Sequence, residues 1–323
     1  MGSRKHRAAA EARSSAAPRK PGSFTFDMLR PVRRGAAKAT FLLALSAVVP
    51  LALAACAERR PPVSEAEVKA VFESKLPSTA DDRIWERVPL HTARLVLQDM
   101  VEPRLMQAST PFVEVQAVTD GREIVFRLSW PDPTRDEVPG PGRFSDAVAV
   151  QLPAATTPDV PAPQMGEEGR PVEITYWSAV SQAIADGRKD EIGAIYPRAA
   201  LDHYPFEAPP LTPGSPEQQA AAKRYAPARN VDNPVAAPRT APVQDLVAQG
   251  PGTLQVAPRT VSRGHGKYGG GRWFVLLARP LPSGAQPGGR TQVAFAVWEG
   301  SRQEVGARKM RSVWIPLAFE AAK

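Results

Sequence analysis

The sequence predicts an all-β protein, an antiparallel β-sandwich with a few short helices. Short runs rich in Val, Ile, Phe and Trp recur between glycines and prolines, as is typical of strands. The 35 prolines are about twice the average usage. They argue against long helices, because an interior proline removes a backbone donor and clashes with the preceding turn. About eight such runs without a fixed-period repeat favour a sandwich.

The elements are expected in the following order. A short helix is predicted at residues 65–74, where Val68, Val71 and Phe72 share one helical face. Thr119-Asp120-Gly121 is a tight-turn signal between two strands, which predicts antiparallel pairing. The predicted strands are residues 92–98, 112–118, 123–130, 147–152, 172–177, 273–278, 292–298 and 311–317.

Two stretches lack a strand pattern. Residues 196–243 are rich in Pro and Ala, yet Tyr196, Tyr204 and Phe206 are more aromatic residues than a solvated linker carries. We therefore expect a long excursion that lies on the domain and lines a pocket. The glycine-rich residues 264–271 lack the Gly-Lys-Ser/Thr ending of a phosphate-binding loop and predict a plain connection between strands.

The N-terminal part has the order of an export signal. The apolar residues 39–55 follow a basic stretch and, with Pro50 inside, are short for a membrane span. Leu53-Ala54-Ala55-Cys56 resembles a bacterial lipobox, in which Cys56 is acylated and becomes the new N-terminus. We expect a signal peptide at residues 1–55, with Met28 as an alternative start, and a lipidated tether at 56–80. One sandwich domain follows at 81–323, anchored by lipid on the periplasmic side of the inner or outer membrane.

Charge and cysteine content exclude several classes of protein. Of 41 Lys and Arg residues and 33 Asp and Glu residues, ten basic and two acidic ones lie in residues 1–56. This leaves 31 of each downstream, so the folded part is formally neutral and no nucleic-acid partner is expected. The single cysteine excludes an internal disulfide, a four-cysteine metal site and covalent haem attachment.

Segments along most of the chain resemble the haem-binding gamma subunit of the ethylbenzene dehydrogenase and selenate or chlorate reductase group of molybdoenzymes. The most specific segment is residues 293–300, Val-Ala-Phe-Ala-Val-Trp-Glu-Gly, followed at the family's spacing by residues 307–314. The other matching segments are residues 85–89, 127–132, 143–153, 165–166, 171–177, 250–254, 271–275 and 279–281.

The resemblance implies a β-sandwich holding one non-covalent haem b with methionine and lysine as axial ligands. Met165 and Lys309 occupy the matching positions. It also implies electron transfer between the iron-sulfur subunit of a periplasmic molybdoenzyme and an external carrier, such as a c-type cytochrome. The chain is then an electron-transfer subunit beside a molybdenum-cofactor catalytic subunit, and itself not an enzyme.

The residues themselves leave alternatives for both ligands. A lysine ligates iron only as a neutral amine, so Lys309 needs a pKa far below ~10.4, and a lysine taken alone is by default a solvated surface residue. Met165 lies in a loop rather than an apolar run, although methionine also fills gaps in cores. Competing thioethers are those of Met100, Met106 and Met310.

Other candidates are weaker. His265, flanked by glycines, is the runner-up iron ligand because histidine is the usual one. Arg143 and Arg279 are candidates for binding the haem propionates. Arg308 cannot ligate because a guanidinium stays protonated. Asp132 and Asp136 share one loop without a matching metal set and are expected to be turn residues.

The alternative function is a sugar- or lipid-binding β-sandwich lipoprotein, in which the six tryptophans stack on a ligand. The positions of Trp130, Trp177, Trp298 and Trp314 in strand runs fit core packing better. No nucleophile, base and orienting group occur together, which argues against an enzyme.

Overall fold

The computed structural model describes residues 61–321 except 139, 191, 199–210, 213, 226 and 232–238. Cys56 and the proposed export signal lie outside the described residues. Among those described, no helix is both long and apolar enough to cross a membrane. The strands are β1 (Val68–Phe72), β2 (His91–Arg94), β3 (Val96–Leu97), β4 (Phe112–Thr119), β5 (Glu123–Pro131), β6 (Ala147–Pro153), β7 (Val172–Ser178), β8 (Val243–Ala248), β9 (Gln255–Val256), β10 (Arg263–Gly269), β11 (Arg272–Pro280), β12 (Arg290–Trp298), β13 (Met310–Arg311) and β14 (Ile315–Phe319).

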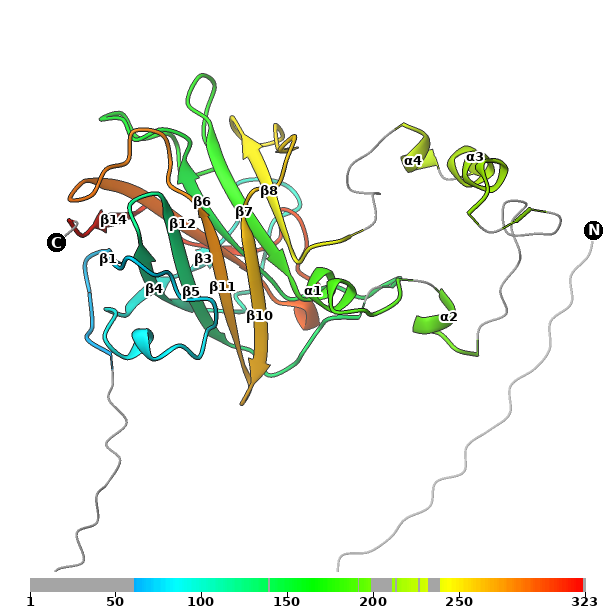
Figure 1. Ribbon diagram of the computed structural model, residues 1–323, viewed down its shortest axis with the longest axis horizontal. Coiled ribbons are helices and arrows are strands. Elements are labelled where there is room, and N and C mark those ends of the chain that lie inside the picture. Colours follow the sequence, from blue (N-terminus) through cyan, green and yellow to red (C-terminus); the bar gives the residue numbers. More distant parts are fainter. Residues whose placement is uncertain are drawn as a thin grey trace, which may run out of the picture. The chain divides into compact units, whose positions relative to one another are not determined.

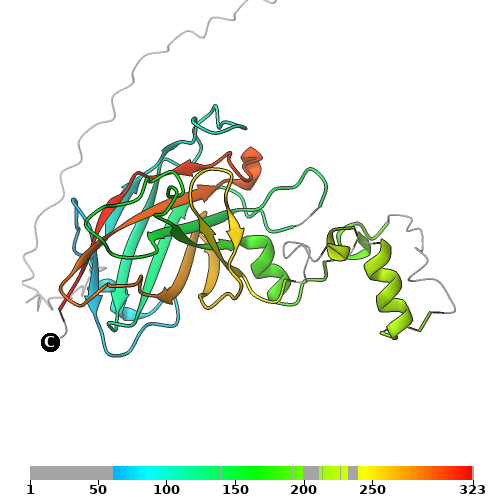
Figure 2. The same cartoon turned by 90° about the horizontal axis from the view of Figure 1, so that it is seen from above.

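The strands form two layers joined by one long strand (Figures 1 and 2). The first layer has the order β10-β11-β5-β4-β1-β14, and the second continues as β12-β6-β7-β8-β9. β12 belongs to both, because its first half pairs with β14 and its second half pairs with β6. This arrangement confirms the predicted mainly β, sandwich-like fold.

Aromatic side chains fill the space between the layers. Phe126 of β5 meets Phe295 of β12 edge to face, with ring centroids 6.2 Å apart. Trp177 of β7 packs in the same way on Trp273 of β11, at 5.0 Å. All four side chains are almost completely buried. Because each contact joins one layer to the other, the core fixes how the layers stack.

The predicted helix at residues 65–74 is wrong. Residues 68–72 form strand β1, which pairs in parallel with β14 and with β4. Val68 and Ala70 are buried while Lys69 between them is exposed, so a period of two overrides the helical spacing. The sheet is therefore mixed around β1 and antiparallel elsewhere.

Two further segments differ from expectation. Residues 311–317 divide into β13 and β14, which pair with different parts of β12. The glycine-rich stretch is itself a strand, β10. A Cβ atom at Gly266 would lie 2.1 Å from the Trp177 ring, so glycine is what lets this strand approach the core.

The helices are short and follow β7. They are α1 (Ala179–Ala185), α2 (Ile192–Ile195), α3 (Pro216–Tyr225) and α4 (Pro227–Asn230), with the 3-10 turns η1 (Arg83–Glu86) and η3 (Gly300–Arg302) elsewhere. Much of the Pro- and Ala-rich excursion lies outside the described residues. Its expected role in lining a pocket stays a prediction.

Candidate functional site

The second layer carries a separate apolar cluster on its outer face. All seven residues of β6 are buried. Val148 and Val150 point into the core between the layers, whereas Ala147 and Ala149 point to the opposite side, as strand alternation requires. This outer-face cluster consists of Ala147, Ala149, Val172, Ile174, Ala248 and Trp298, with Met165, Tyr176, Leu246, Ala296 and Trp314 packed against it.

Met165 reaches this cluster from the loop between β6 and β7. Three hydrogen bonds hold the loop against the sheet. Gly250 N–H donates to the Met165 carbonyl at 2.8 Å. Trp314 Nε1 donates to the Pro161 carbonyl at 2.6 Å, and Gln151 Nε2 to that of Pro163 at 3.0 Å. The thioether is therefore fixed on the cluster rather than carried by a free loop.

The backbone at Met165 is strained. Its φ is 68°, in the left-handed region that non-glycine residues rarely adopt. The next residue, Gly166, has a φ of 78°, and a Cβ atom there would lie 2.9 Å from the Arg170 carbonyl oxygen. A methionine in such a conformation costs about 1–3 kcal/mol, and strain of this kind clusters at functional sites.

Lys309 approaches the same cluster from the loop between η3 and β13. Gln98, which is buried, holds this loop with two hydrogen bonds. Its backbone N–H donates to the Lys309 carbonyl at 3.1 Å, and its side-chain Nε2 donates to the Ala307 carbonyl at 3.0 Å. Trp298 Nε1 donates to the Gly306 carbonyl at 3.1 Å, so the cluster itself anchors the loop.

The amine of Lys309 lies over the outer-face cluster. Its Nζ is 5.2 Å from the centroid of the Trp298 ring. Burial, and to a lesser degree the charge of Arg311, lower the pKa of Lys309 to about 8. A neutral amine is therefore far more accessible here than on a solvated lysine. The structure thus brings Met165 and Lys309 to one cluster.

The three competing thioethers differ in their burial and in their distance from the proposed ligands. Met310 is buried in the core between the layers, and Met106 is 77% exposed. Met100 is different, because its Sδ lies 3.7 Å from both Gln164 Nε2 and an Arg311 guanidinium nitrogen. Since Gln164 precedes Met165 and Arg311 follows Lys309 by two residues, Met100 is the thioether that competes with Met165.

The remaining candidates lie elsewhere. His265 is exposed on β10, with Nδ1 3.1 Å from Gln182 Nε2 of α1. Arg279 is buried in an ion pair with Glu173. Arg143 lies over the Tyr196 ring, 5.7 Å from its centroid. Two guanidinium Nε atoms beside Lys309, those of Arg308 and Arg311, are buried without a hydrogen-bond partner among the described residues.

A second set of polar side chains, Asp132, Asp146 and Glu299, was not predicted as a group from the sequence. Asp132 accepts a hydrogen bond from Thr134 N–H, which is the turn role expected of it. It is also completely buried beside Asp146 and Glu299. The sequence signal was the position of each carboxylate, directly after β5, before β6 and after β12.

Comparison with known proteins gives a family and two relatives. Residues 82–310 match the family model described as ethylbenzene dehydrogenase. A protein of Haloferax mediterranei, assigned as the haem subunit of a respiratory nitrate reductase, is 27% identical over 80% of this chain and 74% of its own. The gamma subunit of dimethylsulfide dehydrogenase from Rhodovulum sulfidophilum is 24% identical over 75% of each chain.

Solved structures give a more distant likeness. A family 9 carbohydrate-binding module from Caldicellulosiruptor kristjanssonii, in complex with glucose, covers 80% of this chain and 97% of its own, with 8% identity and a TM-score of 0.35. A protein of Bacteroides uniformis assigned as carbohydrate-binding covers 79% and 99%, with 9% identity and a TM-score of 0.41.

Proposed function

Because the chain belongs to the ethylbenzene dehydrogenase family, we propose that it is the haem-carrying, electron-transfer subunit of a molybdenum oxidoreductase. The names of the two relatives, a haem subunit and a gamma subunit, support a role as a non-catalytic partner. The single observation that carries the proposal is that Met165 and Lys309, far apart in the sequence, both lie against one outer-face cluster.

The residues of this site fit a haem with two axial ligands. A thioether and a neutral amine are both able to bind haem iron, and the fold provides one of each on an apolar surface. The small side chains of Ala147, Ala149 and Ala296 belong to this cluster beside the Trp298 ring. We assign Met165 and Lys309 as the ligands of one non-covalent haem b, which supplies one-electron redox chemistry when bound.

The chain's own groups prepare the site for that cofactor. Burial of Lys309 favours its neutral form, so less free energy is needed to remove its proton. The hydrogen bonds to the loops of Met165 and Lys309 fix both donors before binding. The unpaired Nε donors of Arg308 and Arg311 are placed to bind acidic groups such as propionates, in preference to Arg143 and Arg279.

The surface around Lys309 supports docking of another subunit. Val96 pairs with Arg311 across β3 and β13 and is 49% exposed. Met100, beside Arg311, is 62% exposed, and Val313 is 59% exposed. Exposed apolar residues gathered at one place mark interaction surfaces. We infer that the iron-sulfur subunit docks here, with a molybdenum catalytic subunit beyond it and a c-type cytochrome as external carrier.

Export and lipid anchoring through Cys56 remain part of the proposal. The basic stretch, the apolar run and the Leu-Ala-Ala-Cys ending support it. Membrane fractionation of cells that express the full chain tests it. Wild-type protein is expected in the membrane fraction and the Cys56→Ser variant outside it. Equal distribution of the two proteins would contradict lipid anchoring.

The tryptophans argue against a sugar-binding alternative. Trp85, Trp130, Trp177, Trp273 and Trp298 are all buried, and Trp314 is half-buried in the outer-face cluster. Sugar-binding sites stack their ligand on an exposed aromatic face. No tryptophan of the described residues presents such a face, since all six serve packing.

An optical spectrum tests the function directly. The full chain is expressed with haem supplied, purified and measured in the oxidised state and after reduction with dithionite. We expect a low-spin b-type spectrum that changes reversibly with redox state, at about one haem per chain. A colourless protein, or bound haem that dithionite does not reduce, would contradict the electron-transfer function.

A further inference from the structure

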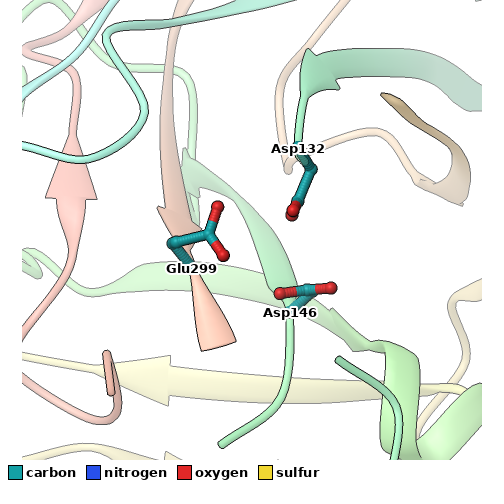
Figure 3. Close-up of side chains that lie close together, drawn as sticks. All are labelled: Asp132, Asp146 and Glu299. Atoms are coloured by element: carbon teal, nitrogen blue, oxygen red, sulfur yellow. The ribbon is translucent and has the colours of Figure 1, made fainter. Parts of the chain in front are cut away.

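Three buried carboxylates converge where strands β5 and β12 end and strand β6 begins (Figure 3). Asp132 follows β5 of the first layer, whereas Asp146 precedes β6 and Glu299 follows β12 of the second. Asp132 and Asp146 are completely inaccessible to solvent, and Glu299 is 5% exposed. The cluster therefore lies where the two layers meet, with contributions from both.

The spacing of the carboxylate oxygens suits one bound cation. One oxygen from each residue can be chosen so that all three lie within 4.8 Å of one another. Ca²⁺ binds oxygens at 2.3–2.6 Å, so two ligands on opposite sides of the ion are about 4.8 Å apart. Oxygens at these spacings leave room for a single ion among them, close to the coordination distance of each.

One carboxylate oxygen in the cluster is unpaired. Oδ1 of Asp132 accepts a hydrogen bond from Thr134 N–H at 3.1 Å, but its buried Oδ2 has no hydrogen-bond partner among the described residues. The carboxyl group of Asp132 points toward those of Asp146 and Glu299 in Figure 3. An unpaired buried carboxylate oxygen is costly, and a cation in the space that it faces would satisfy it.

Backbone and indole N–H groups hold Asp146 in place. Its Oδ1 accepts from Gly300 N–H at 2.9 Å, and its Oδ2 accepts from Asp136 N–H at 2.7 Å and Trp273 Nε1 at 3.0 Å. Oε1 of Glu299 accepts from Ser301 N–H and its hydroxyl. These neutral donors orient the carboxylates without cancelling their negative charge.

The negative charge of the cluster is not balanced by side chains. In the described ranges, no lysine or arginine forms an ion pair with any of the three residues. Burial, and then the charges of Asp146 and Glu299, raise the pKa of Asp132 to about 8. Burial also raises the pKa of Asp146 to about 7. Either protons or a cation must offset this repulsion.

We propose that Asp132, Asp146 and Glu299 bind one Ca²⁺ ion that ties the two layers of the sandwich together. All three ligands are hard carboxylate oxygens, with no sulfur or imidazole beside them in the cluster. The site is buried, which disfavours Mg²⁺ because that ion retains most of its water. The site is structural and independent of the haem function.

Thermal unfolding of the full chain with CaCl₂ tests the proposal. The protein is first dialysed against EDTA, then melted at rising concentrations of CaCl₂ and, separately, of MgCl₂. At about a hundredfold excess over Kd, Ca²⁺ is expected to raise Tm by about 5 °C or more. Mg²⁺ is expected to have less than half of that effect.

Matched variants assign any response to this cluster. Asp132→Asn keeps the acceptor for Thr134 N–H but removes the unpaired charge. Its Tm in EDTA should be no lower than that of the metal-free wild type. Its Kd for Ca²⁺ should be at least tenfold weaker than that of the wild type. Asp136→Asn lies in the same loop outside the cluster and should keep the response. Glu299→Gln provides the same test if Asp132→Asn does not fold.

Three outcomes would overturn the proposal. One is a wild-type Tm that does not change with Ca²⁺, which would mean that the carboxylates share protons instead. Another is a Ca²⁺ response that Asp132→Asn or Glu299→Gln leaves unchanged. The third is an equal response to Mg²⁺, which would overturn the choice of calcium.

Discussion

The outer-face cluster and the carboxylate cluster collect opposite kinds of donor from neighbouring positions on the same strands. On β12, Trp298 packs in the outer-face cluster and the next residue, Glu299, joins the carboxylates. At the start of β6, Ala147 and Asp146 divide in the same way. Because strand side chains alternate between faces, adjacent residues serve different environments.

The two regions also handle charge differently. Around Lys309, burial over the Trp298 ring favours the neutral form of a single amine. Around Asp132, three acidic groups are buried together, and burial and the charges of Asp146 and Glu299 raise the pKa of Asp132. The first region suits two neutral ligands, a soft thioether and an amine, and the second suits a hard cation.

The largest effect is expected from Asp146→Ala. This change leaves three buried donors unpaired, namely Asp136 N–H, Gly300 N–H and Trp273 Nε1. At about 1–3 kcal/mol for each such group, the free energy of unfolding should fall by about 3–9 kcal/mol in EDTA. Urea unfolding measures it. Asp159→Ala, at an exposed position, should change it by less than about 0.5 kcal/mol.

A loss below about 1 kcal/mol for Asp146→Ala would contradict its role as the acceptor that holds the carboxylate cluster together. It would also remove the contrast between a cluster built on buried hydrogen bonds and one built on apolar packing.

A change in pH is expected to have an intermediate effect on the free energy of unfolding of the haem-free protein. Lys309 has a pKa of about 8 when folded and about 10.4 when unfolded, so the unfolded state binds more protons between these values. The free-energy cost of burying the charged amine applies in full below pH 8. It falls as the pH rises and the amine loses its proton. Relative to Lys309→Met, stability should therefore increase between pH 8 and 10, by at most about 3 kcal/mol.

Urea unfolding of both proteins across this range measures the difference. Comparison with Lys309→Met removes contributions from other groups, including Tyr176, whose pKa burial raises to about 12. Parallel pH profiles for the two proteins would show that Lys309 is solvated rather than held against the outer-face cluster.

The smallest effect is expected at Gly166. Gly166 and Gly169 both have a positive φ, 78° and 76°, but only Gly166 has neighbours that a Cβ atom would strike. Alanine at either position strains the backbone, so the difference between them isolates the contacts with the Arg170 and Ala248 carbonyls. Gly166→Ala should unfold about 1–2 kcal/mol more easily than Gly169→Ala.

Gly166→Ala should also retain less haem than Gly169→Ala, because Gly166 adjoins Met165. Size-exclusion chromatography with absorbance at the haem band measures it. Equal retention by the two variants would mean that the position of the Met165 loop does not control haem binding.

Most strands could be predicted from the sequence, because their apolar runs are short and bounded by Gly or Pro. β4, β5, β6, β7, β11 and β12 each lie within two residues of the predicted bounds. β1 could not be predicted, since Val68, Val71 and Phe72 fit a helix as well as a strand. Residues 68–72 form a strand because they pair with β4 and β14 on either side, and these partners are distant in the sequence.

The two sites differed in how far the sequence revealed them. Met165 and Lys309 were predicted from resemblance to a family, and their meeting on one cluster needed the fold. Asp132 was predicted as a turn residue, which is half of its role. Its proximity to Asp146 and Glu299 depends on how the strands β5, β6 and β12 end at the same place, which no local pattern indicates.

The optical spectra of four variants of the haem-loaded full chain test whether Met165 and Lys309 ligate the haem iron. Met165→Ala and Lys309→Ala are expected to lose the six-coordinate low-spin spectrum. Met100→Ala, at the competing thioether, and Met106→Ala, at an exposed one, are expected to keep it. A wild-type spectrum for Met165→Ala together with a lost spectrum for Met100→Ala would contradict the assigned site and move the thioether ligand to Met100.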